Sequence, residues 1–87
     1  MRKLTKKDKE FLKKIGYPEE DFNQIEKANY KYYTEDDQRI SEEEALKKLG
    51  RDRWLSGIGR ACFHASAVRE CKRGSETIYI KSDTFDK

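Results

Sequence analysis

The apolar residues of this chain recur mostly at the three- and four-residue spacing of helices. A first helix is predicted over residues 5–15, because Thr5 can cap it, Asp8 suits its first turn and Gly16 can end it. A second helix is predicted to open at the acidic residues 19–21. Its apolar face is formed by Phe22, Ile25 and Ala28.

Two further helices are predicted on either side of Gly50. Ser41 caps the first, with Glu44 completing a capping box, and the second spans residues 52–71. At 100° per residue the core stripe of this last helix is Trp54, Ile58, Ala61, Cys62, Ala65 and Val68. Gly57 and Gly59 each lower its helical preference by about 1 kcal/mol relative to Ala, so we expect close packing there.

Short stretches rich in aromatic and β-branched residues break the helical pattern. Residues 30–34 predict a strand, residues 35–38 a turn into Arg39 and Ile40, and residues 77–81 a strand that can pair with 30–34. The prediction is one α+β domain over residues 1–87, with about four helices and a two- or three-stranded antiparallel sheet. Residues 82–87 are expected to fray.

The net charge of +3 hides an uneven distribution. Residues 1–14 hold seven Lys or Arg against two acids, residues 15–50 five against ten, and residues 51–87 eight against five. Such a dipolar chain suits an anionic partner, although a solvated surface explains it equally well. No apolar run approaches the roughly 18 residues of a membrane span, so no membrane partner and a cytoplasmic location are expected.

Metal, cofactor and catalytic chemistry are not expected. A zinc site needs four converging ligands, and the only candidates are Cys62, His64 and Cys71. If both cysteines lie on the last helix they face opposite sides, so they are expected to remain reduced thiols. No carboxylate pair or activated nucleophile has suitable spacing, which predicts a protein that is not an enzyme.

The leading functional hypothesis is DNA or RNA binding by the helix pair around Gly50, which is typical of a helix-turn-helix reader. The predicted nucleic-acid-binding residues are Arg51, Arg53, Arg60, His64, Lys72 and Arg73. Lysines on the first helix would add salt-sensitive attraction, and the glycine pair at 57 and 59 is a weak phosphate-cradle signal. The simpler interpretation is helix packing with solvated arginines.

The alternative hypothesis is a protein–protein inhibitor or adapter that uses the acidic middle of the chain against a host protein complex. The predicted contact surface is Glu35, Asp36, Asp37, Glu42, Glu43, Tyr32 and Tyr33. The tyrosines at 30, 32 and 33, with Lys31 between them, are also a pattern that stacks exposed bases, although ordinary sheet packing gives the same pattern.

Residues 49–67, from Leu49 through Arg53, Trp54 and the two glycines to Ala67, resemble small proteins carried by phages and integrative elements of Gram-positive bacteria. The segment 11–17 strengthens the resemblance, which covers about two thirds of the chain. No activity is assigned to those proteins. The resemblance implies a mobile-element context, in which small proteins regulate their own DNA or block host defence machinery.

Overall fold

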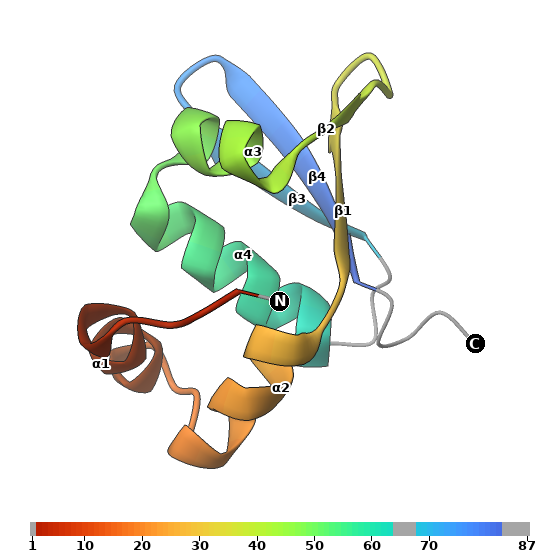
Figure 1. Ribbon diagram of the computed structural model, residues 1–87. Helices are drawn as coiled ribbons and strands as arrows, with labels where there is room; N and C mark the ends of the chain where they lie inside the picture. Colours follow the sequence, from red (N-terminus) through yellow and green to blue (C-terminus); the bar gives the residue numbers. More distant parts are fainter. Residues whose placement is uncertain (1, 64–67, 83–87) are drawn as a thin grey trace.

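The computed structural model describes residues 2–63 and 68–82. Within these residues four α-helices, one short 3-10 helix and four strands follow one another (Figure 1). In chain order they are α1 (Lys6–Lys14), η1 (Glu19–Asp21), α2 (Phe22–Lys27), β1 (Tyr30–Thr34), β2 (Arg39–Ile40), α3 (Glu42–Leu49), α4 (Arg51–Phe63), β3 (Val68–Arg73) and β4 (Glu76–Ser82). The predicted α+β class is confirmed.

The strands form one antiparallel sheet in the order β2-β1-β4-β3. The predicted pairing of residues 30–34 with the C-terminal strand is confirmed, with Tyr32 opposite Ile80. The sheet has four strands where two or three were predicted. Its last strand reaches Ser82, which is buried opposite Tyr30, so the prediction of fraying from residue 82 is wrong at that residue.

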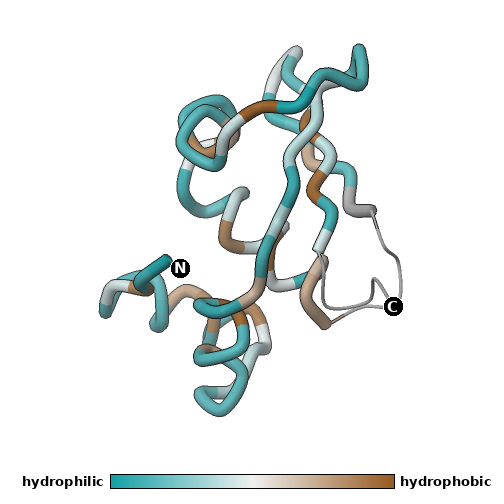
Figure 2. The backbone as a smooth tube through the Cα atoms, turned by 45° about the vertical axis from the view of Figure 1, so that its right-hand side comes forward, coloured by the Kyte–Doolittle hydropathy of each residue, from teal (hydrophilic) through white to brown (hydrophobic). Residues whose placement is uncertain are grey.

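The helices lie on one face of the sheet, with α4 across its middle and α1, α2 and α3 around α4 (Figure 1). Hydrophobic positions are short stretches between hydrophilic ones in α4 and in the strands (Figure 2). They meet in one core, formed by Leu4, Leu12, Phe22, Ile25, Tyr30, Tyr32, Ala45, Leu49, Trp54, Leu55, Ile58, Ala61, Cys62, Ile78 and Ile80.

The predicted helix over residues 52–71 is wrong at residues 68–71, and residues 64–67 lie outside the described part of the chain. α4 ends at Phe63, and Val68–Arg73 form strand β3 instead. Arg73 lies opposite Glu76, so a two-residue turn with Gly74 at φ +58° returns the chain into β4. Hairpin pairing with β4 therefore overrides the helical spacing of the apolar residues there. Cys71 consequently lies on a strand, while Cys62 lies on α4, and both carry thiols as expected.

Gly50 makes the junction of α3 and α4. Its φ of +84° ends α3, its N–H donates to the Leu46 carbonyl, and its own carbonyl accepts from Trp54 N–H at 3.0 Å in the first turn of α4. Ser41 caps α3 as predicted, by accepting a hydrogen bond from Glu44 N–H. The two helices are thus adjacent in the chain and joined through one residue.

The expectation of close packing at the paired glycines is confirmed. A Cβ at Gly57 would lie 2.7 Å from Cys71 Sγ and 2.8 Å from Ile80 Cδ1, and a Cβ at Gly59 would lie 3.0 Å from the Tyr17 ring. The missing side chain at Gly57 therefore lets α4 lie directly on strands β3 and β4. This close approach outweighs the lower helical preference of glycine.

The Asp8 carboxylate joins α1 to the start of α4. It completes the capping box with Thr5 and accepts two bonds from the Arg51 guanidinium, at 2.7 and 2.5 Å, while only 2% exposed. The bonds from Arg51 lower the pKa of Asp8 below its ordinary value, against the effect of burial, and the Thr5 bonds act in the same direction. Arg51 also lies over the Trp54 ring, 5.4 Å from its centroid.

We predict that Gly57→Ala lowers the free energy of unfolding by about 1–2 kcal/mol, because overpacking between helix and sheet exceeds the gain in helix propensity. Urea denaturation measures the change. The cost is expected to shrink in a Cys71→Ala background, which removes one of the two obstructing atoms. Ser56→Ala, the neighbouring control, is expected to change stability little. A Gly57→Ala protein as stable as the wild type would contradict the close approach.

We predict that Arg51→Ala destabilises the protein by about 2 kcal/mol at pH 7, because it leaves a buried carboxylate without its charged donors. The folded-state pKa of Asp8 is lowered, so this stabilisation is present above the unfolded pKa of about 3.9 and is lost as pH falls through the folded pKa. Urea denaturation at pH 7 and pH 3 should show the difference from wild type narrowing in acid. An equal difference at both pH values would contradict the ion pair.

Candidate nucleic-acid interface

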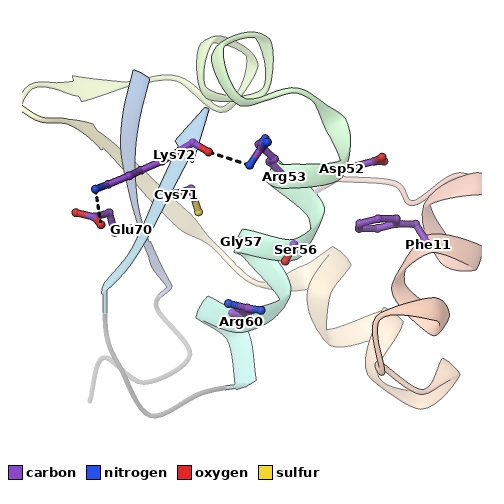
Figure 3. Close-up of a pocket in the computed structure, with 9 residues that line it drawn as sticks. All are labelled: Phe11, Asp52, Arg53, Ser56, Gly57, Arg60, Glu70, Cys71 and Lys72. Atoms are coloured by element: carbon purple, nitrogen blue, oxygen red, sulfur yellow. Dashed lines mark hydrogen bonds and ion pairs between the residues drawn. The ribbon is translucent and has the colours of Figure 1, made fainter. Parts of the chain in front are cut away.

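A groove runs along the exposed side of α4, between β3 and α1. We call it the α4 groove, and its volume is about 300 Å³. Figure 3 shows the side chains that surround it. The lining residues are Phe11, Asp52, Arg53, Ser56, Gly57, Arg60, Glu70, Cys71 and Lys72. Three of the six residues predicted to bind nucleic acid are among them.

Helix geometry brings the two arginines together, whereas Lys72 turns its side chain toward Glu70, away from α4 (Figure 3). Arg53 and Arg60 are seven residues apart on α4, which is about two turns or 10.5 Å along one side of the helix. The Arg53 Nη1 donates to the Lys72 carbonyl at 3.1 Å, which fixes α4 against strand β3 (Figure 3). Arg60 is exposed and forms none of the ion pairs seen among residues 2–63 and 68–82.

Two carboxylates lie near the groove, Asp52 on α4 and Glu70 on the side of β3 that faces away from α4. Glu70 pairs with Lys72 at 3.5 Å, and both side chains are about half exposed or more. Asp52 is exposed in the first turn of α4, where the helix dipole favours a negative charge. An exposed ion pair of this length contributes little, so Lys72 can exchange Glu70 for another anion at small cost.

Helix α1 extends the positive surface on the other side of the groove. Phe11 lines the groove from this helix, and Lys7 and Lys14 lie four residues before and three residues after it. Residues at these spacings share one side of a helix, so both lysines flank Phe11. Both are exposed.

Arg73 lies beside the same groove without lining it. A second hollow of about 340 Å³ at the α3–α4 junction is lined by Leu49, Gly50, Arg51, Asp52, Arg53 and Arg73. Arg53 and Asp52 border both hollows. The guanidinium of Arg73 lies against Gly50, 3.0 Å from the position a Cβ would take.

Arg51, also predicted to bind nucleic acid, is engaged by a buried carboxylate. Its Nε and Nη2 both donate to Asp8, so its guanidinium, although partly exposed, joins α1 to α4. The predicted His64 lies outside the described residues. Of the six predicted residues, Arg53, Arg60, Lys72 and Arg73 are exposed and are not bonded to a buried carboxylate.

The helix pair α3–α4 does not present a reading helix. A helix-turn-helix reader inserts one side of its second helix into the major groove of DNA. Here α4 is buried at Trp54, Leu55, Gly57, Ile58, Gly59, Ala61 and Cys62, and it packs against the sheet and the other three helices. Apart from Arg51 at its start, the exposed residues of α4 are Asp52, Arg53 and Arg60, which form one strip.

The predicted acidic surface divides into two parts. Glu35, Asp36 and Asp37 are exposed in the β1–β2 turn, and Tyr33, Glu35 and Asp37 line a hollow of about 590 Å³ with Thr34, Tyr79 and Lys81. Glu43 is exposed at the start of α3. These residues retain the accessibility that was predicted for a protein contact.

The other two residues of the predicted acidic surface are less accessible: Tyr32 is buried and Glu42 is only partly exposed. Tyr32 is 2% exposed, donates to Glu42 at 2.7 Å and accepts from Trp54 Nε1 at 3.1 Å. Glu42 also accepts from the Arg2 guanidinium at 2.8 Å. Burial would raise the pKa of Glu42, but the bonds from Arg2 and Tyr32 bring it below its ordinary value. Both residues therefore serve an internal network that joins the N-terminus, β1, α3 and α4.

Sequence reasoning missed several residues of the interface. Phe11 was not among the predicted contact residues, although its position between Lys7 and Lys14 was a usable signal. Glu70 and Cys71 were placed on a helix, so their position on a strand beside Arg60 was not foreseen. Among the described residues no cluster of three or more His, Cys, Asp or Glu has a metal-binding arrangement, and no helix is long and apolar enough to cross a membrane.

The α4 groove offers the guanidinium donors of Arg53 and Arg60 over a partly exposed hydroxyl, Ser56, with the lysines Lys7 and Lys14 at its edge. Such donors bind phosphate oxygens, and arginine can do so through two parallel bonds. Comparison with protein-family models, curated proteins and solved structures gives no match to this chain. The function is therefore argued from its own residues.

Proposed function

We propose that this protein is a non-enzymatic module that binds the phosphate backbone of nucleic acid in the α4 groove. The observation that carries the proposal is the pair of exposed arginines, Arg53 and Arg60, along one side of α4 at the hollow between α4, β3 and α1. With Lys7, Lys14 and Arg73 at its edges, this side of the protein holds five cations against the carboxylate of Asp52, while Lys72 and Glu70 pair with each other on the other side of β3. That excess favours a polyanion over a neutral ligand.

The dimensions favour contact with the backbone. A hollow of about 300 Å³ admits a phosphate with part of its sugar, while a double helix can only lie across its mouth. Phosphate contacts position a protein on nucleic acid and carry no sequence information directly. The proposed binding is therefore sensitive to salt and largely independent of nucleic-acid sequence. We propose that the protein acts in the cytoplasm.

The test is a double variant of the two groove arginines. Arg53→Ala with Arg60→Ala removes two phosphate contacts, so the slope of log affinity against log salt is expected to become shallower by about 2, and affinity at low salt to fall. Fluorescence anisotropy with labelled oligonucleotides between 50 and 200 mM salt measures both quantities. The charge-matched control is Lys27→Ala with Lys47→Ala, which removes two exposed lysines outside the groove.

The control variant is expected to keep most of the wild-type affinity. Equal losses in the two double variants would show that only net charge matters. Binding that persists unchanged in the arginine variant would contradict the groove as the site, and a wild-type protein that binds neither single-stranded nor double-stranded nucleic acid would contradict the proposed function.

We propose, as a second candidate, that the β1–β2 turn contacts a basic protein partner. The observation that favours it is the fixed display of Glu35, Asp36 and Asp37. Thr34 and Gln38 close the turn through a bond of 2.9 Å from the Thr34 N–H, and Asp37 has a φ of +63°. Asparagine tolerates that backbone, so neutral variants can keep the turn intact.

For this candidate we predict that Glu35→Gln, Asp36→Asn and Asp37→Asn together abolish capture of a host protein partner while leaving stability unchanged. The measurement is pull-down from nuclease-treated host lysate with the wild type and the variant in parallel. A protein retained by the wild type and lost by the variant supports the candidate. Identical sets of captured proteins would rule out the turn as the contact.

A further inference from the structure

The face of the sheet that the helices leave uncovered carries an ordered set of side chains. The helices of the described chain lie on one face (Figure 1). Paired residues of antiparallel strands point to the same side, so the register places Arg39, Tyr33, Tyr79 and Glu70 in one row across all four strands on the other face. The next row holds Lys31 opposite Lys81.

The middle of the first row is a pair of tyrosines on neighbouring strands. Tyr33 lies directly opposite Tyr79, and both are only partly buried. The Tyr79 hydroxyl donates to Glu70 at 3.2 Å, which restrains that ring from its far end. Two partly exposed rings on central strands form a platform whose orientation is set before any ligand arrives.

The lysine pair in the next row is unfavourable without an anion. Like charges directly opposite each other on neighbouring strands are destabilising. Neither Lys31 nor Lys81 forms an ion pair with a carboxylate of the described residues. A phosphate between the two ammonium groups would replace this repulsion with attraction.

We propose that the uncovered sheet face binds unpaired bases of single-stranded nucleic acid, with bases on Tyr33 and Tyr79 and a backbone phosphate between Lys31 and Lys81. The two rows are two residues apart along each strand, about 6.6–6.8 Å, so a base and its adjoining phosphate can reach both. The proposal rests on the proposed function and names its substrate class.

The other charged residues around this face are compatible with a nucleic-acid strand bound in this orientation. Glu35 and Asp37 border the hollow beside the tyrosines and repel phosphate, so they favour a backbone path on the lysine side; carboxylates can also accept from the exocyclic amines of bases. At the other edge, Lys72 shares this face through its pairing with Thr77 and also lines the α4 groove. A single strand can therefore cross β3 from the stacking platform into the groove. In a double helix the bases are stacked inside and cannot reach the rings.

The test compares three ligands of equal length: a single-stranded oligonucleotide, its duplex and an abasic single strand. The wild type is expected to bind the single strand most tightly. Tyr33→Leu with Tyr79→Leu is expected to weaken single-strand binding by about tenfold or more for each base stack lost, and to leave duplex and abasic binding unchanged. Tyr79→Phe keeps the ring and serves as the matched control, with near wild-type affinity.

Two further measurements test single-strand binding on the sheet face without the double tyrosine variant. Lys31→Gln with Lys81→Gln should also weaken single-strand binding, with circular dichroism confirming the fold of every variant. Ultraviolet crosslinking to a bromouracil-containing strand should map to the peptides containing Tyr33 or Tyr79. Equal wild-type affinity for single strand, duplex and abasic strand, or unchanged single-strand binding in the tyrosine variant, overturns this inference while the groove proposal stands. If the groove arginine variant loses all binding while the tyrosine and lysine variants keep theirs, the α4 groove is the binding site and the uncovered sheet face is not.

Discussion

The structure depends on how closely α4 approaches the sheet. With only a hydrogen at position 57, the helix backbone lies against Cys71 of β3 and Ile80 of β4. That contact buries most of α4 and closes the core beneath it. It also leaves a single exposed strip on the helix, beside the outer edge of β3. The α4 groove exists because the helix is this near to that strand and because α1 stands on its other side.

At the start of α4, one arginine stabilises the fold and another lies at the groove. Arg51 and Arg53 are two residues apart, and so about 200° apart around the axis. Arg51 turns toward the buried Asp8 carboxylate, whereas Arg53 turns toward the Lys72 carbonyl and the groove. The number of arginines in the sequence is therefore larger than the number available to the proposed contact surface. The bonding partner of each guanidinium decides its role.

Local signals in the sequence predicted much of the fold. The caps at Thr5 and Ser41, the glycine stop at Gly50 and the strand at residues 77–81 are all present in the structure. The strand at residues 68–73 was not predicted, because its apolar positions also fit the spacing of a helix, although it forms a tight hairpin with the predicted strand at 77–81. The cationic side of α4 was found, but the Asp8 carboxylate that holds Arg51 comes from a segment 43 residues away.

The most direct test of this account is nuclear magnetic resonance of the arginine side chains during titration with a single-stranded oligonucleotide. We predict that the Nε–H signals of Arg53 and Arg60 shift with added ligand, while that of Arg51, held by Asp8, stays in place. Shifts centred on Arg51 and α3, or no shift in any arginine at saturating oligonucleotide, would contradict the claim that the strip between α4 and β3 is the contact surface.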